Sequence, residues 1–318
     1  STEEEAATRS SRDLDAENGT AESITTIQLN AAGKPASEGN FGNWYYSAAS
    51  GCQLDTGVFA LQPSSEPEAE SALKARLFRI GDNAELVRGT VGCETINYGT
   101  IFDGIFQGKV ANFRTISGGT FQGEVTNNGT ISDGNFQEKV ANFRTISGGT
   151  FEEVVEMNES PDGAKIEGGT FKKGIELNAY YPTITDGLFD GKVSAAEGYP
   201  VMLSISGGLF TKAVDVSNIN AGKLSITGGY FASEPTMPNG SGISFTSVSE
   251  QDGRTFQVPV NGDFSENSYT SLYVPSGSSE QPNIITVKTD TALIDCRAAD
   301  ADVSIMSSVV SNGGNTYE

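Results

Sequence analysis

Between Ile101 and Val155, apolar residues recur at three fixed positions in every fifteen residues, and mostly polar residues or glycine separate them. The first position holds Ile, the second holds Phe five residues later, and the third holds Val four residues after the Phe. The three sets are Ile101, Ile116, Ile131 and Ile146; Phe106, Phe121, Phe136 and Phe151; and Val110, Val125, Val140 and Val155. An amphipathic helix would repeat every 3.6 residues and would not tolerate so many glycines, so the pattern predicts short strands.

The fifteen-residue unit is a sequence repeat as well as a pattern. The segments 107–121 and 137–151 differ at one position only, where the first has Gly108 and the second has Glu138. One such unit cannot bury its own apolar face, so successive units must stack as the coils of a solenoid. We therefore predict an all-β fold, a single-stranded parallel β-helix (β-solenoid). Like residues should stack in ladders at about 4.8 Å per coil.

The same frame continues on both sides of the exact repeats, which sets the predicted solenoid at residues 80–231. Leu86 and Val91 precede it, and Ile166/Phe171/Ile175, Ile184/Phe189/Val193, Ile205/Phe210/Val214 and Ile226/Phe231 follow it. All extra length falls between the third position of one coil and the Ile position of the next. We call this segment the variable corner. Insertions are tolerated where the backbone leaves the ladders, so one edge of the solenoid should carry every large loop.

The flanking segments are predicted to cover the ends of the solenoid, because an open parallel edge would pair with other chains. Residues 1–79 form an acidic N-terminal segment and cap. A short helix is expected near 65–77, since Ser65 can act as N-cap and Glu66 and Glu68 follow in the first turn. Residues 232–318 contain further strand-like runs and form either a β-rich C-terminal cap or degenerate coils.

Composition narrows the possible partners. The 318 residues include 38 Gly and no His, and their formal net charge is −21. Such an acidic surface disfavours nucleic acid and anionic lipid, and no apolar run approaches the roughly 20 residues that a membrane helix needs. We expect no nucleic-acid partner and no membrane insertion. The charge can also simply keep a repetitive β protein soluble.

Candidate catalytic groups are few, because histidine, the commonest general base, is absent from the sequence. Asp103 and Asp133 occupy the same corner two coils apart, about 9.6 Å, which is near the separation of an inverting glycosidase pair. Asp-Gly is also an ordinary turn sequence, and Asp186 repeats it, so we favour a structural role and predict no enzyme activity. We also predict no metal and no cofactor.

Two further sets of residues recur with the repeat. Asn112, Asn127 and Asn142 are predicted to form an internal ladder of amides at a corner, in preference to a ligand site. Phe113-Arg114 and Phe143-Arg144 place an aromatic–arginine pair on alternate coils. Two copies form only a weak pattern.

The three cysteines, Cys52, Cys93 and Cys296, have no metal-ligand spacing. Cys52 and Cys93 could form a disulfide that ties the N-terminal segment to the first coil. Alternatively, all three are buried free thiols.

The loops of the variable corner hold aromatic and polar residues that the repeat does not require. The candidate binding residues are Tyr180, Tyr181, Tyr199, Asn158, Asp162 and Glu197. Aromatic rings beside amides and carboxylates suit a glycan or a peptide. The alternative is that these rings fold back over the core.

The I-x-G-G-x-F units, together with Ile226-Thr-Gly-Gly-Tyr-Phe-Ala-Ser-Glu-Pro235, resemble repeats of secreted or cell-surface β-helix proteins of gut bacteria that are called adhesin-like. The resemblance covers residues 86–235 and transfers no catalytic residue. It implies a right-handed parallel β-helix and an extracellular, surface-displayed protein whose signal peptide has been removed, with a host or microbial glycan or surface protein as partner. The rival class is a polysaccharide lyase or glycoside hydrolase, since β-helices also carry such enzymes.

Overall fold

The chain forms a parallel β-solenoid of about nine turns, which confirms the predicted fold class. The computed structural model describes residues 23–65, 71–161, 163–197, 202–249 and 254–260, and the backbone of five later strands. It divides into two compact units, residues 1–153 and 154–318, which we call unit 1 and unit 2 and describe separately. The right-handed turn stays a prediction.

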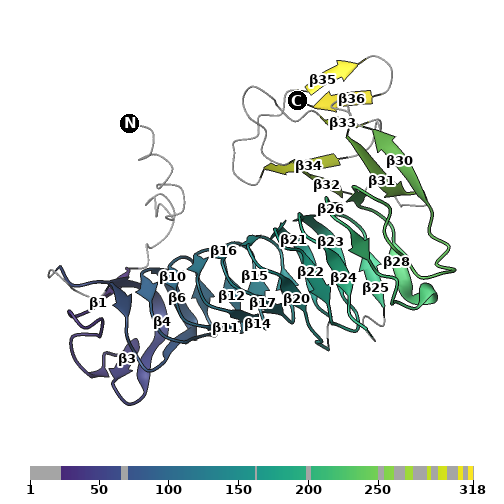
Figure 1. Ribbon diagram of the computed structural model, residues 1–318. Coiled ribbons are helices and arrows are strands. Elements are labelled where there is room, and N and C mark those ends of the chain that lie inside the picture. Colours follow the sequence, from purple (N-terminus) through teal and green to yellow (C-terminus); the bar gives the residue numbers. More distant parts are fainter. Residues whose placement is uncertain are drawn as a thin grey trace. The chain divides into compact units, whose positions relative to one another are not determined.

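Unit 1 opens with seven strands, of which β4 and β6 are long, and continues with the short strands of the exact repeat (Figure 1). The opening strands are β1 (Thr25–Gln28), β2 (Gly39–Asn40), β3 (Trp44–Ser47), β4 (Gly51–Gln62), β5 (Ala72–Leu73), β6 (Phe78–Arg88) and β7 (Thr90–Val91). The repeat strands are β8 (Thr95–Asn97), β9 (Thr100–Ile101), β10 (Ile105–Phe106), β11 (Val110–Asn112), β12 (Thr115–Ile116), β13 (Thr120–Phe121), β14 (Val125–Asn127), β15 (Thr130–Ile131), β16 (Asn135–Phe136), β17 (Val140–Asn142), β18 (Thr145–Ile146) and β19 (Thr150–Phe151).

The predicted ladders form the core of unit 1. Ile116 pairs in parallel register with Ile131, Phe121 with Phe136, and Val125 with Val140. The rings of Phe106, Phe121, Phe136 and Phe151 stack at successive centroid distances of 5.0, 4.7 and 4.8 Å. All of these side chains are buried. Each coil therefore covers the apolar face of its neighbour, as the repeat requires.

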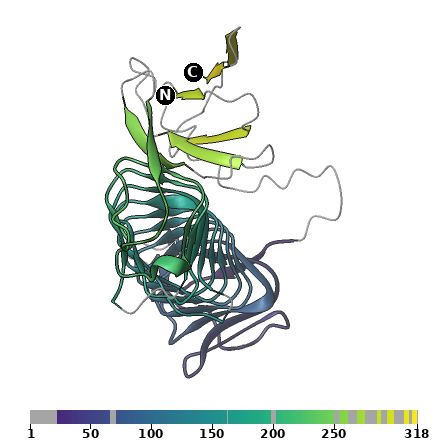
Figure 2. The same cartoon turned by 90° about the vertical axis from the view of Figure 1, so that its right-hand side faces the viewer.

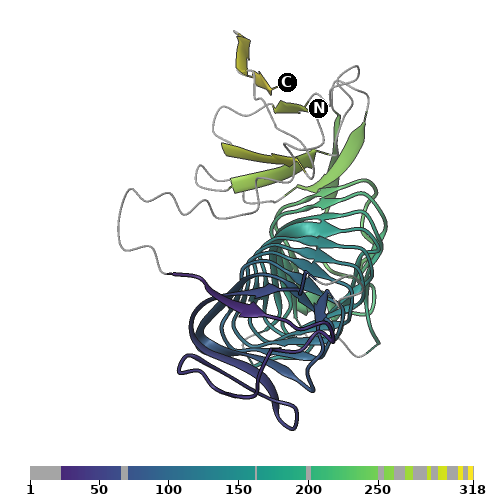
Figure 3. The ribbon, with the colours of Figure 1, turned by 90° about the vertical axis from the view of Figure 1, so that its left-hand side faces the viewer.

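The first strand of the solenoid in unit 1 does not present an open edge. β4 pairs in parallel with β6 on one side. On its other side, β1 pairs with residues 59–62 and β3 pairs antiparallel with residues 51–54 (Figure 3). Ile27 and Tyr46 are buried by this pairing. The pairing protects the edge from association with another chain.

The helix predicted near 65–77 is wrong for the residues that the structure describes there. Ala72 and Leu73 form β5, whose partners in the next coil are Thr90 and Val91. Both β5 side chains are buried. Burial and ladder hydrogen bonds to a neighbouring coil outweigh a local capping preference, which is a weak determinant of structure. Residues 66–70 of this prediction lie outside the described residues.

Cys52 and Cys93 are free, so the disulfide alternative is wrong. Cys52 is buried and Cys93 is half-buried. Burial, followed by the nearby Cys93, raises the pKa of the Cys52 thiol to about 12. The side chain of Cys296 lies outside the described residues.

Unit 2 repeats the arrangement with longer connections. Its coil strands are β20 (Val155–Met157), β21 (Lys165–Phe171), β22 (Ile175–Leu177), β23 (Thr183–Phe189), β24 (Val193–Ala195), β25 (Leu203–Ile205), β26 (Leu209–Phe210), β27 (Val214–Asp215), β28 (Leu224–Ile226) and β29 (Tyr230–Phe231). A 3-10 turn, η2 (Ala221–Lys223), precedes β28. The rings of Phe171, Phe189, Phe210 and Phe231 stack at 4.9, 4.6 and 4.6 Å, so the core is of the same kind.

After β29 the strands change direction (Figure 2). They are β30 (Phe245–Ser249), β31 (Thr255–Pro259), β32 (Tyr269–Val274), β33 (Ile285–Val287), β34 (Leu293–Ala298), β35 (Ser307–Val310) and β36 (Gly314–Tyr317). β31 pairs antiparallel with β30 and with β29, and Phe256 packs against Leu188 and Leu209. One isolated parallel bridge, between Asp215 of β27 and Thr236, extends the solenoid ladder by a single step after β29. No helix in the described part of the chain is long and apolar enough to cross a membrane.

Candidate functional site

The variable corner of unit 2 carries four loops, all on one edge. They span residues 158–164, 178–182, 196–202 and 216–223. Each leaves a strand of the ladder β20–β22–β24–β27 and enters a strand of the ladder β21–β23–β25–β28. The prediction of a single loop-bearing edge is therefore confirmed for unit 2.

These loops stack on one another as the strands do. The amide of Asn178 donates to the carbonyl of Met157 at 2.8 Å, and the amide of Met202 donates to the carbonyl of Tyr180 at 2.8 Å. Ala164 and Ala179 are buried within the loops. These backbone hydrogen bonds and the buried Ala179 tie the loop 178–182 to its neighbours, which suits it to present side chains for recognition.

Tyr180 and Tyr181 lie together on this edge. Their rings meet edge to face, with centroids 6.3 Å apart and an interplanar angle of 62°. Tyr180 is 37% exposed and Tyr181 is 51% exposed, so neither ring has folded back over the core. Gly163 has a φ of 73°, and a Cβ there would lie 2.5 Å from the carbonyl oxygen of Tyr181. Glycine at this position lets the preceding loop pass directly beneath Tyr181.

The structure brings two more predicted residues to the same corner. Asn158 is half-buried one coil before the tyrosine loop, and Glu197 is exposed one coil after it. Tyr199 and Asp162 lie outside the described residues. Met202, which sequence reasoning missed, adds an exposed thioether beside Tyr180. No repeat position marks it, since its place follows only from the hydrogen bond between the two loops.

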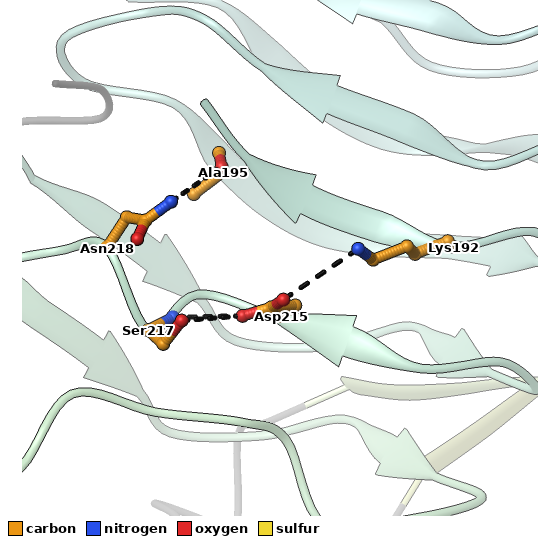
Figure 4. Close-up of polar contacts among 5 residues, drawn as sticks. All are labelled: Lys192, Ala195, Asp215, Ser217 and Asn218. Carbon is orange, nitrogen blue, oxygen red and sulfur yellow. Dashed lines mark hydrogen bonds and ion pairs between the residues drawn. The ribbon is translucent and has the colours of Figure 1, made fainter. Parts of the chain in front are cut away.

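A polar cluster at the start of the last loop was also missed (Figure 4). Asp215 accepts hydrogen bonds from the hydroxyl of Ser217 at 2.8 Å and from its amide at 3.3 Å. Lys192 lies 3.7 Å from the other carboxylate oxygen, and the Asn218 amide donates to the carbonyl of Ala195 at 3.4 Å. The hydrogen bonds from Ser217, with the charge of Lys192, hold the pKa of Asp215 below its ordinary value. An Asp two residues before a Ser is a turn signal, and the cluster fixes the path of the loop.

The carboxylates considered for catalysis serve turns. Asp103 accepts a hydrogen bond from the amide of Gly104 at 2.7 Å, and Asp133 accepts one from Gly134 at 2.7 Å. Asp186 does the same with Gly187 at 2.8 Å. Among the described residues, no group of three His, Cys, Asp or Glu could hold a metal ion.

In unit 1 the variable corner is closed by the predicted asparagine ladder, extended by one rung to Asn97. The side-chain amides of Asn97, Asn112 and Asn127 each donate to the Asn of the next coil, at 2.7, 2.7 and 2.8 Å. Their second donor bonds reach backbone carbonyls, such as that of Thr115 at 2.9 Å from Asn97. All four asparagines, including Asn142, are buried. A buried amide needs such partners, and here the ladder supplies them.

The fold defines the chain as a parallel β-solenoid, but a comparison with known proteins finds no relative. No protein family, curated protein or solved structure matches the sequence.

Proposed function

We propose that this chain is an extracellular, surface-displayed, adhesin-like module that binds a glycan without modifying it. The binding surface is the variable corner of unit 2. The observation that carries the proposal is the pair of exposed rings, Tyr180 and Tyr181, on stacked loops of a rigid scaffold. The resemblance of the I-x-G-G-x-F repeats to adhesin-like surface proteins supports the location.

The chemistry of this corner suits a saccharide. A sugar ring has an apolar face that can lie on an aromatic ring, and hydroxyls that need polar partners. The tyrosine rings would supply the first, and the half-buried Asn158 and the exposed Glu197 of the neighbouring loops would supply the second. Each ring that stacks on the ligand should contribute on the order of 1 kcal/mol to the binding free energy.

The rival function is a polysaccharide lyase or glycoside hydrolase. An enzyme of this kind would use a free pair of carboxylates on the two sides of the substrate bond. Asp103 and Asp133 each hold the glycine amide that follows them, which supports a role in turn structure. We therefore place the ligand at the loops and expect it to leave unchanged.

A glycan array probed with purified protein tests the proposal. The variant Tyr180→Ala/Tyr181→Ala should bind the glycans found on the array at least fivefold more weakly, while its melting temperature stays the same because the loops lie outside the ladders. Phe41→Ala is the matched control, since Phe41 is an exposed ring in the turn between β2 and β3 of unit 1.

Three outcomes would overturn the proposal. Unchanged affinity with unchanged melting would move the site elsewhere. A large loss of stability would show that the rings belong to the core. Release of shortened glycan products, seen by mass spectrometry, would favour the enzyme.

Antibody labelling of intact cells that produce the protein checks surface display, and labelling only after lysis would contradict it.

A further inference from the structure

The dipeptide Asn-Gly occurs in two different surroundings among the described residues. Asn128-Gly129 lies at the variable corner of unit 1, and Asn239-Gly240 lies in the segment 232–244 between β29 and β30 of unit 2. The remaining Asn-Gly pairs, at 18–19, 261–262 and 312–313, lie outside the described residues. Asparagine is a thermolabile residue, and a following glycine has no side chain to hinder attack of its own nitrogen on the asparagine side chain.

The fold holds the pair of unit 1 in place. The Gly129 amide donates to the side-chain oxygen of Asn127 at 3.2 Å, and the Asn128 amide donates to the carbonyl of Asn112 at 2.7 Å. Gly129 is buried, and a Cβ there would lie 2.3 Å from the carbonyl oxygen of Arg114. The Gly129 nitrogen is therefore engaged as a donor, and close packing on the preceding coil restricts rotation of this peptide.

The pair of unit 2 has none of these restraints. Asn239 and Gly240 are both exposed, and a Cβ on Gly240 would meet nothing within 4 Å. Among the described residues, no group accepts a hydrogen bond from the Gly240 amide or bonds to the Asn239 side chain. The Ser241 amide donates to the carbonyl of Pro238 at 3.3 Å, and Gly240 has a φ of 79°, as in a type II turn. A turn with so few contacts can change its backbone angles at small cost.

We propose that Asn239 is a modification site, at which the asparagine converts to aspartate and isoaspartate without an enzyme. The Gly240 nitrogen loses its proton and attacks Cγ of Asn239. The bond between Cγ and Nδ2 breaks, and ammonia leaves with that proton, so that a cyclic succinimide remains. Water then opens the ring. Attack of water at Cγ gives aspartate, and attack at the α-carbonyl carbon gives isoaspartate, whose main chain runs through Cβ and Cγ.

The conversion changes both the charge and the main chain of this turn. It replaces a neutral amide with a carboxylate, and isoaspartate adds one carbon atom to the main chain between positions 239 and 240. The turn lies outside the ladders of the solenoid, so the modified protein should keep its fold. The site is separate from the tyrosine loops, so this inference goes beyond the function proposed for them.

Peptide mapping by mass spectrometry tests the proposal. Folded protein is kept at mildly alkaline pH, and conversion is measured as a mass gain of about one dalton in the peptides that contain Asn239 or Asn128. Conversion at Asn239 should be at least tenfold faster than at Asn128. In urea the two sites should react at similar rates, because the same dipeptide then lacks the restraints of the fold. In water enriched in heavy oxygen, each product should gain one heavy oxygen atom, as opening of the ring requires.

The variant Asn239→Gln is the matched control. Glutamine keeps the amide, but its longer side chain would have to form a larger and less favourable ring with the next amide nitrogen. This variant should abolish the mass gain of that peptide and leave the melting temperature unchanged.

Three results would overturn the proposal. One is that Asn239 stays unchanged in the folded protein while both sites react in urea. Another is that Asn128 reacts as fast as Asn239 in the folded protein. The third is that the peptide gains mass at the wild-type rate in Asn239→Gln, since another residue of that peptide would then be reacting.

Discussion

The variable corner is a short connection in unit 1 and a loop in unit 2. In unit 1, two residues such as Phe113 and Arg114 connect the third strand of one coil to the first strand of the next. In unit 2 this connection becomes a loop, for example residues 178–182. The phenylalanine stacks beneath the two corners are alike, so the core does not cause the difference.

The difference begins at the last residue of the third strand. Asn112, Asn127 and Asn142 occupy it in unit 1, whereas Met157, Leu177 and Ala195 occupy it in unit 2. The side-chain oxygen of each asparagine accepts a hydrogen bond from the backbone amide two residues later. For example, the Gly129 amide donates to the Asn127 oxygen at 3.2 Å. This bond turns the chain at once into the next strand. A hydrocarbon side chain offers no such bond, so the chain leaves the ladder and returns through a loop.

A second contrast concerns the residue that points outward just before each core Phe. Before the four stacked Phe of unit 1 it is Ile105, Thr120, Asn135 or Thr150, and each of these residues remains at least partly exposed. In unit 2 it is Leu188 or Leu209, which are buried beneath Phe256 of β31. The two adjacent leucines of unit 2 therefore give a further strand an apolar face to pack on, whereas Ile105, the apolar residue at this position in unit 1, stays 42% exposed.

The largest expected effect concerns the phenylalanine core that both units share. Phe136→Ala in unit 1 and Phe189→Ala in unit 2 should each lower the free energy of unfolding by about 3–5 kcal/mol. Both rings are buried between two neighbouring rings, so the two costs should be similar. Urea unfolding followed by circular dichroism measures them. A cost below about 1 kcal/mol in one unit alone would show that the stacks are not equivalent.

The next effect tests the polar rung itself. Asn127→Leu should cost about 3 kcal/mol or more, because it removes the hydrogen bonds of the Asn127 side chain to Asn112, to Asn142 and to the Gly129 amide. The reciprocal change Leu177→Asn should also destabilise, since its ladder neighbours Met157 and Ala195 have no side-chain amide. If Asn127→Leu proved neutral by thermal unfolding, the ladder would not be what closes the corner.

Alkaline pH should act through the buried thiol of unit 1. The folded pKa of Cys52 is about 12, above the unfolded value of roughly 8.5, so the native state keeps a proton that the unfolded state loses. Stability from this group is complete below the unfolded pKa and is lost as the pH rises toward 12. The slope is about 1.4 kcal/mol per pH unit. Between pH 8 and 11, the free energy of unfolding should fall less steeply with pH in Cys52→Ala than in the wild type. An unchanged slope in that variant would assign the effect to another group.

The smallest effect is a stabilisation. Thr95 occupies a Val position of the core, and its buried hydroxyl has no hydrogen-bond partner. Thr95→Val should raise the free energy of unfolding by about 1 kcal/mol, because it removes an unsatisfied polar group at nearly constant volume. The reverse change Val110→Thr in the next coil is the control and should destabilise. A loss of stability in Thr95→Val would mean that the hydroxyl has a role in the fold.

Much of this protein follows from local periodicity alone. The fifteen-residue spacing of Ile, Phe and Val is enough to predict the strands, the three ladders and the edge that bears the loops. Each coil must bury its apolar residues against the same residues of the next, so only one stacking register satisfies the whole repeat. The asparagine ladder follows by the same reasoning, since equal side chains at equal positions must meet.

The tertiary structure decided whatever depends on neighbours that are not in the repeat. Ala72 and Leu73 are a strand and not a helix because the next coil offers them a pairing partner. Tyr180 and Tyr181 are exposed while Ala179 of the same loop is buried, so the alanine and not a ring packs on the core. The stack of Tyr98 on Phe113 and the different surroundings of Asn128 and Asn239 became visible only with the structure. Periodicity determines which residues are buried together, but contacts between irregular segments determine which of the remaining side chains reach the solvent.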